Sequence, residues 1–129
     1  MTKVASPFIR KYMDWRIAKH PVAKQTISML VVEAIPTILG VKGSDIQHIA
    51  QALEFHPKKL QRLLKEEGTS YSAILDEVRK NIAARLLAES DISVTRLAII
   101  LDYSSDRAFT TASKRWFGMS ATDYRMQMR

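Results

Sequence analysis

Five polar side chains gather on one expected helix in the first half of the chain, and four of them are cationic. The helix is expected over residues 57–67, where Leu60, Leu63 and Leu64 would face inward. The opposite face would carry Lys58, Lys59, Gln61, Arg62 and Lys65. A basic face of this kind favours a polyanionic partner. Taken alone, a solvated charged face on any small helical bundle is an equally good interpretation.

The residues before this helix supply what would position it. Ser44 and Gln47 fit a capping box that opens a short helix over residues 44–53, with Ile46, Ile49, Ala50 and Leu53 inward. Residues 54–56 would form a turn, and Pro57 stands where a first helical residue is expected. Two short helices joined by a turn, the second with a basic face, are typical of a helix-turn-helix.

A similar arrangement returns about fifty residues later. Matching pairs at an offset of 48 are Ala50 and Ala98, Leu53 and Leu101, and Phe55 and Tyr103; at an offset of 50 they are Gly68 and Gly118, and Ser70 and Ser120. Ser93 would start one helix, and Ser105 would cap a second over residues 106–116. Gly118 would close that helix, and Ser120 would cap a short last one through Met128. The chain therefore contains two alike units.

A long amphipathic helix is expected between the two units, over residues 70–89 with Ser70 as its N-cap. Its apolar positions have the spacing of one helical face, namely Tyr71, Ile74, Leu75, Val78, Ile82, Leu86 and Leu87. About 19 residues at 1.5 Å each give a rod of roughly 28 Å. Two helix-turn-helix units joined by a rigid spacer are the expected architecture.

Residues 1–43 are expected to form a separate N-terminal helical segment, and residues 44–129 the double helix-turn-helix domain. Phe8, Tyr12 and Trp15 mark one face of a short helix that ends near residue 20. A second helix is expected over residues 21–35, where Pro36 would stop or kink it. Gly40 and Gly43 then mark a loop. The aromatic face is better explained by packing than by ligand binding.

Composition limits the classes of protein to which the chain can belong. Its 129 residues contain no cysteine, which excludes disulfides and thiolate metal sites and fits an intracellular setting. Neither a membrane span nor a signal peptide is expected from the apolar runs. The formal net charge is +7, which favours a polyanion without choosing among nucleic acid, membrane and acidic protein.

Two segments resemble the AraC/XylS family of bacterial transcription regulators. HPKKLQRLLKEEGTSYSAILDEVR is similar to the family's first recognition helix and linker, and LAIILDYSSDRAFTTASKRWFGMSATDYR to its C-terminal signature. The resemblance covers residues 44–125 and implies an all-α fold of two helix-turn-helix units joined by a long helix. It also implies a bacterial cytoplasmic protein whose partner is double-stranded DNA, with RNA polymerase as a candidate second partner and no membrane or cofactor. An effector or dimerisation domain of the kind common in the family would lie outside this chain.

The same resemblance implies the residues that contact DNA. Base readout would fall to Lys58, Gln61 and Arg62 in the first unit and to Asp106, Arg107, Thr110 and Thr111 in the second. Lys59, Lys65, Lys114 and Arg115 would contact phosphates. Arginine and lysine pair with guanine, and glutamine with adenine, in the major groove.

The second unit departs from the family pattern at four positions. Thr111 stands where an arginine is usual, Ser113 where a core aromatic is usual, Asp102 where the turn glycine is usual, and Ala121 where a proline is usual. These departures bear on the strength and sequence preference of the second unit rather than on its fold.

Neither enzyme nor metal chemistry is expected. His20, His48 and His56 are scattered without a metal-ligand spacing, and the glycine-rich and nucleophile motifs of common enzymes do not occur. Acidic neighbours such as Glu66–Glu67 and Asp76–Glu77 are expected to be solvated on helix surfaces. The competing hypothesis is a helical protein-interaction module that uses the face of Phe8, Tyr12 and Trp15.

Overall fold

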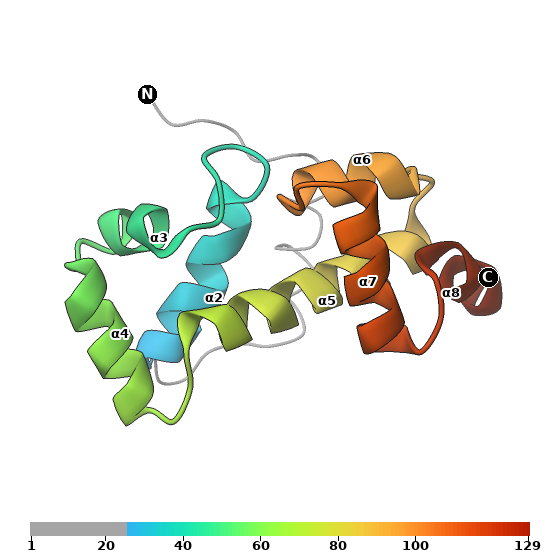
Figure 1. The fold of residues 1–129 in the computed structure, drawn as a ribbon. Coiled ribbons are helices and arrows are strands. Elements are labelled where there is room, and N and C mark those ends of the chain that lie inside the picture. Colours follow the sequence, from blue (N-terminus) through green and yellow to red (C-terminus); the bar gives the residue numbers. More distant parts are fainter. Residues whose placement is uncertain (1–25) are drawn as a thin grey trace.

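Six of the seven helices in the described part of the chain are arranged around the seventh, which is the longest. The computed structural model describes residues 26–129, and every regular element among them is an α-helix (Figure 1). They are α2 (Ile27–Ile38), α3 (Ile46–Ala52), α4 (Pro57–Glu66), α5 (Tyr71–Glu89), α6 (Val94–Ile100), α7 (Asp106–Phe117) and α8 (Ala121–Met128). The predicted all-α class with two helix-turn-helix units on a long linker helix is confirmed.

Side-chain caps explain where most of these helices begin. The hydroxyl of Ser70 accepts from the backbone N–H of Ala73 at 3.2 Å and starts α5. Ser93, Ser105 and Ser120 accept in the same way at the starts of α6, α7 and α8. Each cap satisfies an N–H group that has no partner within its helix. These predicted caps are confirmed, as is Gly118, which ends α7 in the left-handed conformation.

The prediction that Ser44 caps α3 is wrong. Asp45 is the N-cap, and its Oδ1 accepts from the backbone N–H of His48 at 3.1 Å. Ser44 instead contacts the linker helix, since its carbonyl oxygen accepts from the Tyr71 hydroxyl at 2.7 Å and its own hydroxyl accepts from Arg79 Nη2 at 3.0 Å. An aspartate is as good an N-cap as a serine, so these tertiary contacts decide between the two.

Of the two effects predicted for Pro36, stopping or kinking the preceding helix, the stop is wrong. Helix α2 begins after Thr26, whose hydroxyl accepts from the N–H of Met29, and it continues through Pro36 to Ile38. Pro36 lies in the last turn and is buried with Ile35 and Ile38. Burial of this apolar turn offsets the hydrogen bond that proline cannot donate.

The two turns between paired helices have the same backbone conformation. Glu54 and Asp102 have left-handed φ values of 61° and 62°, respectively. In the first turn the N–H of Phe55 donates to Ala50 at 2.8 Å, and in the second the N–H of Tyr103 donates to Ala98 at 3.0 Å. The repeat inferred from matching residues is therefore a repeat of structure.

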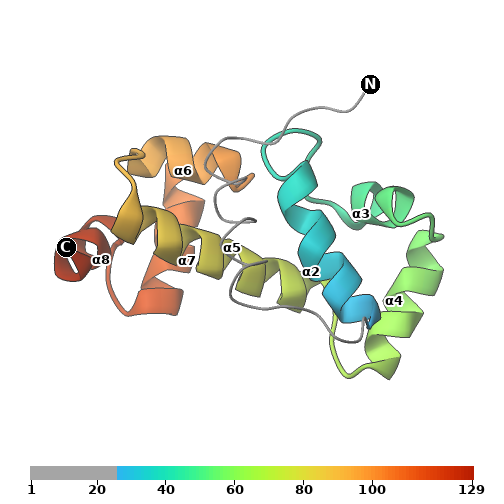
Figure 2. The same ribbon diagram turned by 180° about the vertical axis from the view of Figure 1, so that it is seen from behind.

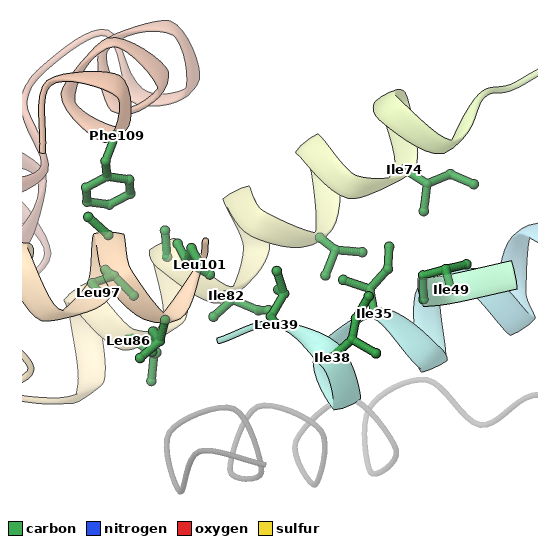
Figure 3. Close-up of a cluster of buried hydrophobic side chains, with 14 of the residues drawn as sticks. Ile35, Ile38, Leu39, Ile49, Ile74, Ile82, Leu86, Leu97, Leu101 and Phe109 are labelled. Carbon is green, nitrogen blue, oxygen red and sulfur yellow. The ribbon is translucent and has the colours of Figure 1, made fainter. Parts of the chain in front are cut away.

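The core follows α5 from one unit to the other (Figure 3). In the first unit Ile74 of α5 lies near Ile35 and Ile49, and in the second Leu86 lies near Leu97. All the apolar positions predicted for the linker face are buried except Leu75, which is partly buried against the core. Helix α5 is therefore the common wall of both units.

Helix α2 packs against the side of α5 opposite to α7, as the two views show (Figures 1 and 2). Val31, Ile35 and Leu39 are fully buried in the shared core. The division of the chain at residue 43 stays a prediction. The expected helix with Phe8, Tyr12 and Trp15, and residues 21–25 of the next, lie outside the described residues. None of the helices in residues 26–129 combines the length and apolar composition that a membrane crossing requires.

Candidate nucleic-acid interface

Helix α4 presents one apolar and one basic face, as its sequence predicts. Leu60 and Leu64 are fully buried, and each such side chain contributes roughly 1.5–3 kcal/mol to folding. The five predicted contact residues of this helix, Lys58, Lys59, Gln61, Arg62 and Lys65, are all exposed. His56 caps the helix through Nδ1, which accepts from the backbone N–H of Lys58 at 3.2 Å. The apolar face thus anchors α4 while the polar face is open to a partner.

Among residues 26–129, the long side chains of α4 have only weak partners. The Arg62 guanidinium lies 3.7 Å from the Glu66 carboxylate, and both side chains are more than half exposed, at 63% and 61%. The Lys59 ammonium lies 5.9 Å from the centre of the Phe55 ring. Gln61 and Lys65 border an open groove of about 550 Å³ that reaches Tyr71 at the start of α5. These groups can turn to a ligand at little cost.

Helix α7 occupies the equivalent place in the second unit. Phe109, Ala112 and Ser113 face the core, and Phe109 lies 5.5 Å from the Tyr103 ring and 6.3 Å from the Trp116 ring, centre to centre. Ser113 stands at the position where the family usually has a core aromatic. It is fully buried, and its hydroxyl donates to the Phe109 carbonyl at 2.9 Å. The hydroxyl therefore has a hydrogen-bond acceptor within its own helix, so its burial leaves no donor unpaired.

The predicted contact residues of α7 make more hydrogen bonds within the protein than those of α4. Asp106 Oδ2 accepts from the hydroxyl of Thr95 at 3.0 Å, and the Thr111 hydroxyl donates to the carbonyl of Arg107 at 3.0 Å. Arg107, Thr111 and Lys114 are exposed, and Thr110 is partly buried. The outward face of α7 therefore differs in chemistry from that of α4.

Arg115 contacts the linker helix through two nitrogens. Its Nη1 and Nη2 donate to Asp76 at 2.9 and 2.8 Å, and Trp116 Nε1 donates to the same carboxylate at 3.1 Å. The hydrogen bonds from Arg115, together with the one from Trp116, lower the pKa of Asp76 below its usual value. Arg115 remains 58% exposed, and three of its five N–H groups are left for a further partner.

The two sets of predicted contact residues lie in different units, near opposite ends of α5 (Figure 1). The structure brings Lys58, Gln61 and Arg62 together on α4, and Arg107 and Lys114 together on α7. The two sets do not form a single pocket. An extended ligand with two contact regions suits this placement.

Glu67 is exposed, as expected for these acidic neighbours, whereas Asp76 is partly buried, and both accept hydrogen bonds from distant parts of the chain. Glu67 accepts from the backbone N–H groups of Ile27 and Ser28, both at 2.9 Å, and so holds the start of α2. Hydrogen bonds from Ser28 lower the pKa of this carboxyl. Both carboxylates accept hydrogen bonds from residues about 40 positions away along the chain. The local sequence around the acidic residues therefore does not predict these contacts.

Arg79 and Tyr71 make contacts that the sequence does not reveal: the Tyr71 hydroxyl donates to the carbonyl oxygen of Ser44 at 2.7 Å, and Arg79 Nη2 donates to the Ser44 hydroxyl at 3.0 Å. They occupy α5, where Tyr71 fits the apolar spacing and Arg79 fits an ordinary charged position. Among the histidines and acids of residues 26–129, no group of three is placed to hold a metal ion.

Comparisons with known proteins agree with this geometry. Residues 49–127 match the family model described as a helix-turn-helix domain. The chain is 34% identical over 115 residues to the HTH-type transcriptional regulator VirS of Mycobacterium tuberculosis, covering 89% of this chain and 33% of that protein. Its structure is similar to that of a DNA-binding transcriptional dual regulator from Escherichia coli K-12, with a TM-score of 0.75 and 27% identity over 83% of this chain and 96% of that one.

A transcriptional regulator from Chromobacterium violaceum, described as AraC-type, shares the fold at a TM-score of 0.67 and 22% identity, over 79% of this chain and 91% of that one. The chain spans about a third of the length of the first curated relatives that it matches.

Proposed function

Because this chain belongs to the AraC-type helix-turn-helix family of transcription regulators, we propose that it binds specific sequences of double-stranded DNA and regulates transcription. Helices α4 and α7 are its two recognition helices. The observation that carries the proposal is the repeated unit: each of these helices has a buried inner face, an exposed outer face and the same left-handed turn before it. A helix-turn-helix presents its second helix to the major groove in this way.

Contacts with bases and with phosphates divide between the outward side chains. We assign base contacts to Lys58, Gln61, Arg62, Asp106, Arg107, Thr110 and Thr111, and phosphate contacts to Lys59, Lys65, Lys114 and Arg115. Base contacts specify the sequence, whereas phosphate contacts fix orientation and add affinity. The exposure of the α4 set and the free N–H groups of Arg115 support this division.

Selection of bound duplexes from a random library, followed by footprinting, tests the proposal. We expect a defined sequence and two protected major-groove segments about 34 Å apart, because the units lie near the two ends of α5. Lys58→Ala should weaken binding, and Arg96→Ala, which removes an exposed arginine from α6, is the matched control. Selection of no sequence, or protection of a single groove segment, would contradict the two-helix proposal.

Salt dependence separates DNA binding from the protein-interaction alternative. Phosphate contacts release counterions, and the logarithm of affinity falls with the logarithm of salt concentration at a slope of about −0.9 for each contact. An aromatic interface through Phe8, Tyr12 and Trp15 should respond weakly. The helix-turn-helix comparisons do not favour that alternative.

Finer parts of the proposal concern the setting of the chain. We propose RNA polymerase as a second partner and the bacterial cytoplasm as the location. We also propose that an effector or dimerisation domain lies outside this chain and that the protein catalyses no reaction. The small share of its relatives' length that the chain spans supports a further domain. Transcription from a template carrying the selected site, with and without the chain, tests the contact with polymerase.

A further inference from the structure

The segment that leads into the first helix-turn-helix unit touches the second unit directly, in addition to the connection through α5. The loop between α2 and α3 meets the turn between α6 and α7, where the backbone N–H of Gly40 donates to Asp102 Oδ2 at 2.9 Å. Gly40 has a left-handed φ of 72°, and a Cβ there would lie 3.0 Å from the Ile100 carbonyl oxygen. Loop and turn are therefore as close as their backbones allow.

Arg79 joins this contact from the linker helix and bonds to both sides of it. Its Nε donates to the Leu101 carbonyl at 2.7 Å and its Nη2 to the Asp102 carbonyl at 3.1 Å, both in the turn of the second unit. Nη2 also donates to the Ser44 hydroxyl at 3.0 Å, just before α3 of the first unit. The guanidinium lies 4.4 Å from the centre of the Tyr103 ring. One side chain thus holds three segments together.

Asp102 is an unusual residue for its backbone conformation. Its φ of 62° lies in the left-handed region, which a residue with a Cβ adopts at a cost and glycine adopts freely. The side chain compensates by supplying the acceptor for Gly40. An aspartate here links the units, whereas a glycine would make the turn without the link.

We propose that Arg79 and Asp102 are positioning residues that set the relative orientation of α4 and α7, and thereby the spacing of the two base sequences that the chain reads. The spacing part rests on the proposed DNA-binding function. Helix α5 packs into the core of each unit. The polar junction adds a direct and directional attachment between the segment before α3 and the turn of the second unit, which limits small rotations of one unit against the other. The two recognition helices then meet DNA at one separation and one rotation.

Asp102→Gly separates this role from a general effect on folding. Glycine accepts the backbone conformation of the turn, so the variant should melt close to the wild type while it loses the bond to Gly40. Asp102→Asn keeps a side-chain oxygen that can accept and should behave like the wild type. Arg79→Ala removes the other half of the junction. Arg85→Ala is the control, since it removes the same charge from α5 at a residue that pairs with Glu89 one turn on.

The first measurement is the affinity for the selected duplex and for the same duplex with one base pair inserted between its half-sites. One inserted pair rotates the second half-site by about 35° and shifts it by about 3.4 Å. Wild type, Asp102→Asn and Arg85→Ala should lose about fivefold, the lower end of the cost of a misplaced base contact, because insertion displaces the Arg107 contact of the second unit. Asp102→Gly and Arg79→Ala should lose less than about threefold on insertion, because their units can adjust.

The second measurement needs no DNA. The chain has no cysteine, so Gln51→Cys on α3 and Thr122→Cys on α8 place two spin labels, one on each unit. Pulsed electron paramagnetic resonance measures the distance between the two labels. It should give one narrow distance distribution for the wild type and broad ones for Asp102→Gly and Arg79→Ala. Wild-type distances and wild-type loss on insertion in Asp102→Gly would overturn the proposal, even if Arg79→Ala does not fold. A wild type that selects no duplex would overturn the proposed function instead, and the label distances still decide the orienting role.

Discussion

Arg62 is the side chain of α4 best placed to contact a base. It lies in the middle of the helix, its side chain is 63% exposed, and within the described residues it forms a 3.7 Å ion pair with Glu66. An exposed pair of this kind is worth about 0.3–0.5 kcal/mol, so its loss on binding costs little. We predict that Arg62→Ala weakens binding by roughly 1–3 kcal/mol and relaxes the preference at one base pair.

Titrations on the selected duplex and on its single-base variants, at one salt concentration, measure this effect. Arg96→Ala on α6 is the matched control, because it removes one exposed positive charge away from the proposed interface. Equal weakening by Arg62→Ala on every duplex would show a phosphate contact rather than base readout.

The Asp76 carboxylate should make a pH-dependent contribution to the stability of the fold. Hydrogen bonds from Arg115 hold the pKa of Asp76 below its usual value in the folded chain. A lowered folded pKa stabilises the fold at pH values above the unfolded pKa of about 4, and this stability is lost as the pH falls through the folded value. Wild type should therefore be more stable than Asp76→Asn at pH 7, with the difference closing in acid.

The difference should not exceed about 1 kcal/mol, because the Asp76 side chain is 37% exposed and solvent screens the pair. Urea unfolding of both proteins at a series of pH values measures it. Glu77→Gln, at the exposed neighbouring position, is the control. A stability difference that stays constant from neutral pH into strong acid would contradict the role of the ionised carboxylate.

At the scale of elements, α5 joins the cores of both units, and Ile82 lies at its centre. The Ile82 side chain is fully buried on the face that both units share. We predict that Ile82→Ala lowers the free energy of unfolding by about 2–5 kcal/mol through lost burial and the cavity left behind. A domain of this size has roughly 5–15 kcal/mol in total, so the loss is large.

Thermal and urea unfolding measure the effect of Ile82→Ala. Asn81→Ala changes the adjacent exposed residue of the same helix and should alter stability by no more than about 0.5 kcal/mol. Near-identical melting of Ile82→Ala and wild type would mean that this face of α5 does not carry the core.

The helices that could be predicted from the sequence are those with local signals. Helix α5 has an apolar stripe and a serine cap, and α7 has a serine cap and a closing glycine, so nearby residues determine their bounds. The predicted end of α2 at Pro36 is wrong, because burial of Pro36 outweighs its local preference. Ser44 does not cap α3, because its hydroxyl accepts instead from Arg79, 35 positions away, at 3.0 Å.

At the scale of the whole molecule, the sequence predicts the outward face of α4 but not the contacts that orient the units. Periodicity alone predicts that Lys58, Gln61 and Arg62 are exposed, because the buried leucines lie on the opposite side of the same helix. The bond between Gly40 and Asp102 joins residues 62 positions apart, and neither residue type predicts the other. Such contacts depend on how the helices pack, and no local pattern contains that information.

The two units should read DNA unequally. On α4 the outward set is cationic and amide-bearing, with weak internal partners. On α7, Asp106 repels phosphate and already accepts from Thr95, and the Thr111 hydroxyl is bonded to its own helix. Arg115 is held by Asp76, which leaves Arg107 as the main side chain able to reach bases. We therefore predict that the first unit specifies sequence and that the second mainly holds the backbone.

A base-by-base substitution scan of the selected site, with wild type, Arg62→Ala and Arg107→Ala, tests this asymmetry. For the wild type, substitutions in the half-site under α4 should each cost about 1–3 kcal/mol, the usual range for a specific contact, and those under α7 clearly less. Arg62→Ala should flatten one position of the first half-site, whereas Arg107→Ala should remove most of the preference that remains in the second. Arg96→Ala should leave both profiles unchanged, because its side chain lies outside both proposed recognition faces. Comparable losses across both half-sites in the wild type would mean that Arg107 gives the second unit full specificity, and the predicted asymmetry would then be wrong.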